Sequence, residues 1–151
     1  MKVAFFSSKP YEIEYFTKLN KISDLQISYF DSNLNADTAK LAIDCEAICA
    51  FVNDTMDSEV IETLAAQGVK TIALRSAGFN HVDLDACKTM GINVFYVPDY
   101  SPYSVAEHTF ALLLTLNRKT HKAYQRVREG DFSLTHLMGT ELHNKTMGII
   151  G

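Results

Sequence analysis

Short β-rich runs alternate with helical patterns along residues 1–100, and this alternation restricts the fold more than any other feature. Three of the runs are nearly continuous in apolar residues, as in parallel strands that are covered on both faces. The runs are Val3–Ser7, Leu25–Asp31, Ala47–Asn53, Val69–Arg75 and Asn93–Val97. Strands separated by helices in this way are joined by right-handed crossovers into one open sheet. The sequence therefore predicts an α/β fold with a parallel sheet.

Helices are expected between these strands. The segments are Tyr11–Asn20, Ser58–Gln67 and Asp83–Met90. Ser58 stands where a capping box would begin, although the acidic partner Glu62 comes one position late. Gly68 and Gly91 follow two of the helices, and glycine there commonly adopts the left-handed conformation that ends a helix.

The pattern changes after Pro98, where a single long helix is predicted from Ser104 to Arg128. From Phe110 to Leu116 this helix is apolar on nearly all sides, so we expect its first half to be buried between two bodies. Its second half is basic, which leaves two interpretations. A nucleic-acid patch is one, and a solvated helix end favoured by the helix dipole is the preferred one.

The last residues, Thr146 to Gly151, form a short apolar run that ends in glycine. We interpret the run as a strand and Gly151 as the first glycine of G-x-G-x-x-G, the loop that follows the first strand of a dinucleotide-binding unit. Gly151 alone binds nothing, because pyrophosphate recognition needs the following amides and helix. A natural end with a frayed tail is the alternative. The preferred interpretation is the front part of a longer enzyme.

Charge, apolar-run length and cysteine spacing argue against nucleic acid, membranes and metal ions as partners. A formal charge of −4 provides no basic field for nucleic acid or an anionic membrane. The longest apolar stretch is far shorter than the roughly 20 residues that cross a bilayer, and no signal-peptide pattern is present, so we expect a cytoplasmic protein. Cys45, Cys49 and Cys87 lack zinc-ligand spacing and nearby histidines. They are predicted to be buried, reduced thiols, and no metal site is expected.

Two segments carry a family signature. Ile72–Asp85 is IALRSAGFNHVDLD, and Val97–His108 is VPDYSPYSVAEH. The runs Tyr124–Arg126, Gly130–Leu134 and Lys145–Gly151 fit the same pattern, so the similarity covers the whole chain in register. The sequence resembles the D-isomer-specific 2-hydroxyacid dehydrogenases, and within them the bacterial fermentative D-lactate dehydrogenases.

This resemblance implies a two-domain enzyme that reduces pyruvate to D-lactate, uses NAD as its cofactor and forms a homo-oligomer. Residues 1–100 would form a flavodoxin-like substrate domain. Residues 101–151 would begin an NAD-binding Rossmann domain that continues past Gly151. The family's catalytic arginine, acid and histidine would then lie beyond Gly151, so we expect no catalytic residue in this chain and no activity from it alone. His108 matches the family's helix signature and not its acid–base catalyst.

Ala77 and Gly78 are the first candidates for substrate binding. A glycine beyond the carboxyl end of a strand lets successive amides face an anion, and a tight turn alone is the alternative. By resemblance, these two amides bind the substrate carboxylate, the Tyr100 hydroxyl donates to it, and Phe51 limits the size of the substrate's side chain. A cap on the domain seam and plain core packing are the alternatives for Tyr100 and Phe51. Val105 would pack against the nicotinamide.

A phosphoacceptor receiver domain shares the βα order and would use Asp54. It requires an acidic pair where this chain has Ser7-Ser8-Lys9, and a lysine where Pro98-Asp99 stands, so this class is disfavoured. A non-catalytic NAD-sensing module and a phosphoglycerate or formate dehydrogenase also remain open. Arg75, just before the candidate carboxylate loop, is expected either to have a structural role or to support the residues that contact the substrate.

Overall fold

The computed structural model describes residues 1–23 and 25–150, which divide into two units between Tyr100 and Ser101. The strands of the first unit are β1 (Lys2–Phe5), β2 (Gln26–Tyr29), β3 (Ala47–Ala50), β4 (Thr71–Leu74) and β5 (Asn93–Phe95). Its helices are α1 (Pro10–Ser23), the 3-10 helix η1 (Ala39–Ala42), α2 (Ser58–Ala66) and α3 (Leu84–Met90). The second unit contains α4 (Pro102–Arg118) and α5 (Thr120–Arg128).

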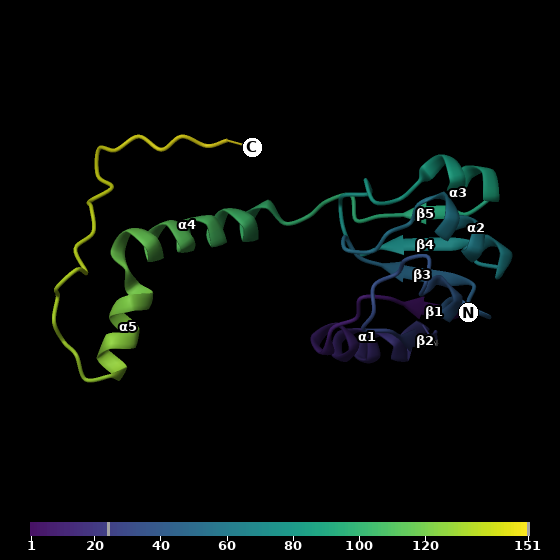
Figure 1. Ribbon diagram of the computed structural model, residues 1–151, viewed down its shortest axis with the longest axis horizontal. Helices are drawn as coiled ribbons and strands as arrows, with labels where there is room; N and C mark the ends of the chain where they lie inside the picture. Colours follow the sequence, from purple (N-terminus) through teal and green to yellow (C-terminus); the bar gives the residue numbers. More distant parts are fainter. Residues whose placement is uncertain (24, 151) are drawn as a thin grey trace. The chain divides into compact units, whose positions relative to one another are not determined.

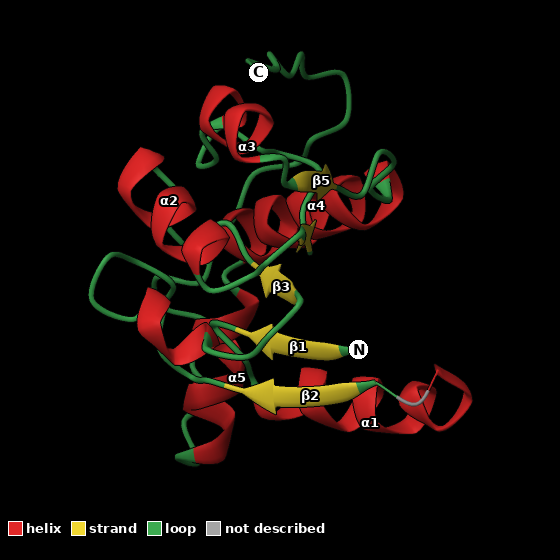
Figure 2. Cartoon of the chain, turned by 90° about the vertical axis from the view of Figure 1, so that its right-hand side faces the viewer, coloured by secondary structure: helices red, strands yellow, loops and turns green. Residues whose placement is uncertain are grey.

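The strands pair in parallel in the order β2-β1-β3-β4-β5 (Figure 1, Figure 2). Val3 of β1 stands opposite Ile27 on one side and Ala47 on the other. This order is that of a doubly wound, flavodoxin-like sheet, so the predicted α/β fold is confirmed. The strands are shorter than the predicted runs because those runs include loop residues. Ser7, for example, has a φ of 54°, outside the extended region.

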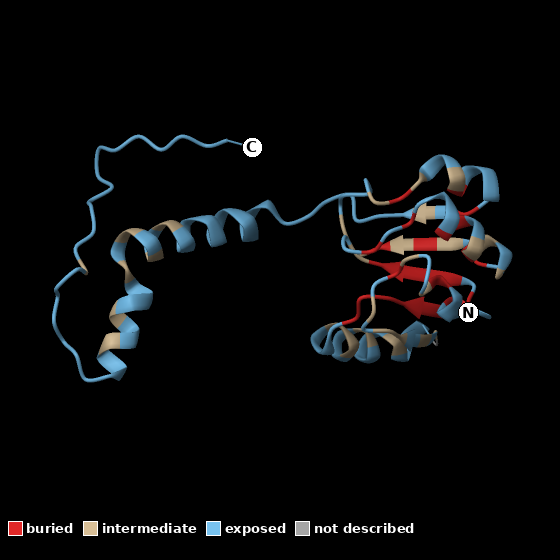
Figure 3. Cartoon of the chain, viewed as in Figure 1, coloured by how far each residue is buried: buried red, intermediate tan, exposed pale blue. Residues whose placement is uncertain are grey.

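Both faces of the sheet are covered at the central strands β1 and β3, as their apolar runs predicted. Val3 and Phe5 lie on the face of α1, where the rings of Phe5 and Phe16 are 4.8 Å apart between centroids. Ala4 and Phe6 belong to the larger core cluster on the other face, which also includes residues of η1, α2 and α3. The central strands β1 and β3 are buried along most of their length (Figure 3).

Helix ends in the first unit follow capping rules, with one difference from the sequence interpretation. The residue that caps α2 is Asp57, whose side chain accepts from the Val60 amide at 3.1 Å. The capping box predicted at Ser58 is therefore wrong, because Ser58 is already the first helical residue. The predicted terminators are confirmed, since Gly68 and Gly91 have φ angles of 95° and 67°.

The prediction of one long helix from Ser104 to Arg128 is wrong, because Lys119 separates α4 from α5. Its φ of 53° is left-handed, which ends the hydrogen-bond ladder of α4. Contacts with a later segment accompany the break. The Lys119 Nζ donates to the His136 carbonyl at 3.0 Å, and the Asn117 amide group pairs with the backbone of Thr140. Partners this distant along the chain leave no local pattern in the sequence.

The first half of α4 is not covered by the described residues of its own unit, and its expected burial between two bodies stays a prediction. Phe110 is 53% exposed, and α4 has no buried residue. Leu142 and Met147 line a hollow together with Phe110 but do not cover it. Residues 146–150 form no strand, because the described residues of this unit offer no strand for them to pair with. Gly151, the predicted phosphate-loop glycine, lies outside the described residues.

Helix length and composition do not fit a membrane span. Across residues 1–23 and 25–150, no helix is long and apolar enough to cross a bilayer.

Candidate functional site

The candidate substrate residues of the first unit follow three different strands. Phe51 comes directly after β3, Ala77 and Gly78 follow β4, and Tyr100 follows β5. Parallel strands end at the same edge of a sheet, and ligands of open α/β sheets bind beyond that edge. The topology therefore places these residues at the edge where ligands are expected.

Ala77 and Gly78 form an exposed loop whose backbone amides are free. Neither amide donates a hydrogen bond to another described residue. The Ser76 hydroxyl donates to the Gly78 carbonyl at 2.8 Å, and the Val97 amide donates to the Ser76 carbonyl at 3.0 Å. These two contacts fix the carbonyls of the loop and leave its amides available. Successive unpaired amides are donors for an anionic oxygen.

Gly78 itself is not required by the geometry of the turn. Its φ lies outside the left-handed region, and a Cβ placed on it would meet no atom within 4 Å. The interpretation of Gly78 as a residue that only permits a tight turn therefore has no steric basis in the fold. A side chain there would instead occupy the open space beside the free amides.

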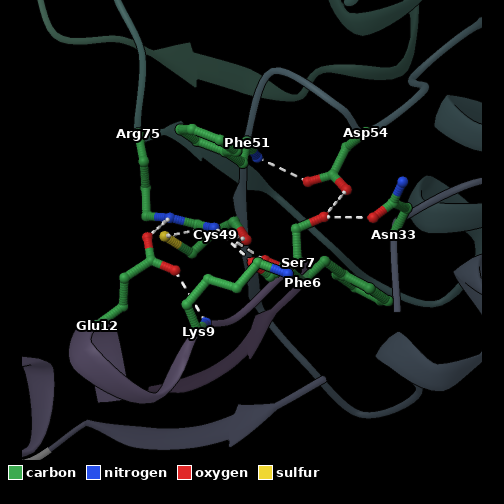
Figure 4. A network of polar contacts seen from close by, with 9 residues as sticks. All are labelled: Phe6, Ser7, Lys9, Glu12, Asn33, Cys49, Phe51, Asp54 and Arg75. Carbon is green, nitrogen blue, oxygen red and sulfur yellow. Dashed lines mark hydrogen bonds and ion pairs between the residues drawn. The ribbon is translucent and has the colours of Figure 1, made fainter. Parts of the chain in front are cut away.

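Phe51 is half-buried, and its backbone is held by a buried carboxylate. The Phe51 amide donates to Asp54 Oδ2 at 2.6 Å (Figure 4). The other oxygen of Asp54 accepts from the Ser7 hydroxyl at 2.6 Å and from the Leu34 amide at 2.9 Å. Asp54 is only 2% exposed. Because a phosphoacceptor must be accessible to its phosphodonor, this carboxylate does not fit the receiver-domain alternative.

Arg75 contacts the ends of three neighbouring segments. Its Nη1 donates to the Cys49 carbonyl at 3.2 Å, and its Nη2 donates to the Phe6 carbonyl at 3.0 Å (Figure 4). Its Nε forms an ion pair with Glu12 Oε1 at 2.9 Å. The side chain of Arg75 is 10% exposed. The guanidinium thus satisfies strand-end carbonyls inside the first unit, which supports the expected structural role.

Glu12 is the residue at this edge that sequence reasoning missed. Its Oε1 accepts from Arg75, and its Oε2 accepts from the Lys9 amide at 3.0 Å, just before α1. The second contact has the spacing of a helix cap and could have been found from the sequence. The ion pair joins positions 12 and 75, and no local spacing signals it.

Tyr100 and Val105 lie in different units. Tyr100 is 63% exposed at the end of the first unit, and Val105 is 52% exposed in the first turns of α4. Val105 lines an apolar hollow of about 450 Å³ together with residues of α4 and of the segment 147–150. Each side chain is accessible within its own unit.

Burial shifts the pKa of several side chains in the first unit. It raises the pKa of the thiols, with the Arg75 hydrogen bond opposing this at Cys49. It lowers the pKa of His81, with the charge of Asp54 opposing. All three cysteines, Cys45, Cys49 and Cys87, are buried and free, as predicted. Among residues 1–23 and 25–150, no group of three or more metal-binding side chains could hold an ion.

Residues 3–133 match the family described as D-isomer specific 2-hydroxyacid dehydrogenase, catalytic domain. Among curated relatives, 2-hydroxyacid dehydrogenase homolog 1 of Schizosaccharomyces pombe is 54% identical over 151 residues. D-lactate dehydrogenase of Escherichia coli is 48% identical over 151 residues. Each comparison covers 100% of this chain and 46% of the relative, so the chain spans about half the length of these curated relatives.

Solved structures give the same result. The apo-structure of E. coli D-lactate dehydrogenase matches with a TM-score of 0.90 at 48% identity, over 97% of this chain and 47% of that chain. The pyruvate reductase of Chlamydomonas reinhardtii matches with a TM-score of 0.82 at 44% identity, over 94% and 42%. An NAD-complexed D-isomer specific 2-hydroxyacid dehydrogenase from Lactobacillus delbrueckii ssp. bulgaricus matches with a TM-score of 0.65 at 31% identity, over 95% and 44%. The resemblance seen in the sequence motifs is confirmed, and the chain belongs to the D-isomer-specific 2-hydroxyacid dehydrogenase family.

Proposed function

We propose that the full-length protein reduces pyruvate to D-lactate with NADH, and that residues 1–100 form its substrate domain. The observation that supports this most directly is the pair of exposed, unpaired amides of Ala77 and Gly78 at the carboxyl edge of the sheet. Relatives named as D-lactate dehydrogenase and pyruvate reductase support the choice of substrate.

The two amides bind the substrate carboxylate in this proposal. Each hydrogen bond to a charged group contributes about 1.5–3 kcal/mol, so two of them give the carboxylate a fixed position. The Tyr100 hydroxyl, exposed at the end of the same unit, donates a further hydrogen bond to it. With the carboxylate held at this edge, C2 of the 2-oxoacid has a defined orientation.

Phe51 contacts the substrate's side chain in this proposal. A half-buried aromatic ring at the sheet edge leaves room for a methyl group and disfavours longer chains. One methylene in such a pocket changes the free energy by about 1–3 kcal/mol, so selectivity for pyruvate over larger 2-oxoacids is expected to be partial.

The nicotinamide packs against the accessible Val105 side chain in this proposal. That side chain is half-exposed in the first turns of α4, which leaves it accessible to one face of an aromatic ring. When bound, the cofactor supplies the hydride that C2 receives. The residues of this chain orient the carboxylate and hold the ring, and we expect the proton donor to come from the rest of the full-length protein.

The test is the substitution Gly78→Val in the full-length protein. A valine side chain would occupy the space beside the amides, so we expect the pyruvate KM to rise at least about tenfold. The melting temperature should stay nearly constant, because a Cβ at Gly78 meets no atom within 4 Å. Ala66→Val, at an exposed position at the end of α2, is the matched control and should leave KM unchanged.

Two outcomes would contradict the proposal. An unchanged pyruvate KM in Gly78→Val would refute the role of the two amides. Turnover of 3-phosphohydroxypyruvate in preference to pyruvate would instead assign the protein to the phosphoglycerate dehydrogenase group.

A further inference from the structure

Arg75 contacts two aromatic rings in addition to its hydrogen-bond acceptors. Its Cζ lies 4.0 Å from the centroid of the Phe5 ring and 5.3 Å from that of the Phe51 ring. Both distances fall within the roughly 6 Å over which a guanidinium is attracted to an aromatic face. Phe5 is buried in the core, whereas Phe51 is half-buried at the sheet edge. The guanidinium therefore connects the Phe51 ring to the core.

The Phe51 ring lies outside the hydrophobic core of the first unit. Its backbone amide is fixed by Asp54, but a fixed amide does not fix the side-chain rotamer. Phe51 belongs to neither of the hydrophobic clusters found among the described residues. The Arg75 guanidinium, 5.3 Å from the ring centroid, is a contact that favours one ring position.

Glu12 in turn orients the guanidinium. Its carboxylate accepts from Nε of Arg75, so the plane of the group is set and its two remaining nitrogens face the carbonyls of Cys49 and Phe6. The Glu12 side chain is 14% exposed, and its second oxygen is held by the Lys9 amide. A lysine at position 75 would supply a point charge and no planar fork, so it could not reproduce these contacts together.

We propose that Arg75, oriented by Glu12, is a positioning residue that holds the Phe51 ring and thereby sets the size selectivity of the substrate pocket. This inference rests on the proposed 2-oxoacid reductase function. Neither residue touches the substrate in this arrangement. Loosening the ring would make room for longer substrate side chains, so the effect concerns selectivity between substrates more than the rate with pyruvate.

The experiment compares Glu12→Gln with Glu14→Gln in the full-length protein. Both changes neutralise a carboxylate of α1, but Glu14 pairs with the exposed Lys18 and with no other described residue. The readout is kcat/KM for pyruvate divided by kcat/KM for 2-oxoisocaproate. We expect this ratio to fall about tenfold in Glu12→Gln and to stay unchanged in Glu14→Gln. Arg75→Lys should lower the ratio at least as much.

A double-mutant cycle separates positioning from a general loss of structure. In a Phe51→Leu background the effect of Glu12→Gln on the ratio should vanish, because the ring to be positioned is absent. If Arg75→Lys does not fold, Glu12→Gln still gives the test, since glutamine has the shape of glutamate and removes only its charge and one acceptor. An unchanged ratio in Glu12→Gln, with only a lower melting temperature, would overturn the inference. Failure of the wild type to reduce any 2-oxoacid would refute the proposed function itself, and this inference with it.

Discussion

Replacing Asp54 by asparagine tests the internal organisation of the sheet edge. One oxygen of the asparagine can still accept from the Ser7 hydroxyl and the Leu34 amide, as Asp54 Oδ1 does. The other position becomes an NH₂ group that faces the Phe51 amide, so the 2.6 Å hydrogen bond to Oδ2 is lost and two donors oppose each other. Hydrogen bonds to a charged group contribute about 1.5–3 kcal/mol. We therefore expect Asp54→Asn to lower the free energy of unfolding by about 2–3 kcal/mol.

Urea titration followed by far-UV circular dichroism measures this loss, and it suits a chain that contains no tryptophan. The midpoint should fall with an unchanged m-value. Asp37→Asn is the control, because the carboxylate of Asp37 is exposed and accepts no hydrogen bond from another described residue. A loss below about 0.5 kcal/mol in Asp54→Asn, equal to that of a surface substitution, would refute the reasoning.

Two further predictions concern titration. The unfolded state protonates His81 at its ordinary pKa near 6.5, whereas the folded state has a lowered pKa, so the stability associated with His81 is present above about pH 6.5 and is lost as the pH falls below it. Urea midpoints between pH 7.5 and 5.5 should fall more steeply in the wild type than in His81→Gln, and parallel curves would contradict this. The cysteines are buried with raised pKa values, so their thiols should react with iodoacetamide far more slowly at pH 8 in the native state than in urea. Equal rates would contradict it. The three thiols are Cys45, Cys49 and Cys87.

The parallel sheet could be predicted because its signals are local. Each strand is a short apolar run, and glycines at positions 68 and 91 mark helix ends through their own φ angles. The cap of α2 was misplaced by one residue, because Asp57 and Ser58 are both good capping residues and only the backbone decides between them. The break at Lys119 depends on partners in the segment 136–140, which no periodicity reveals.

In the candidate site, too, some features follow from the sequence and others depend on the tertiary structure. The loop that contains Ala77 and Gly78 stands at the end of a predicted strand, so its place in the fold follows from the strand pattern. The place of the ion pair between Glu12 and Arg75 does not, because the pair joins the start of α1 to the end of β4, which only the tertiary fold brings together. The sequence also could not show that the two amides are unpaired, because that depends on the hydrogen bonds of the surrounding residues.

The loops at the carboxyl edge of the sheet differ in the contacts that hold them. Asp54 fastens the loops that follow β1, β2 and β3 to one another, because its three donors come from those loops. The loops after β4 and β5 meet through the Val97–Ser76 hydrogen bond and the exposed rings of Phe79 and Tyr96. Because fewer contacts hold these two loops, we expect local opening there to cost less free energy and a bound carboxylate to order the loop. Substitutions that change only the mobility of the loop would thus tune affinity without touching the ligand.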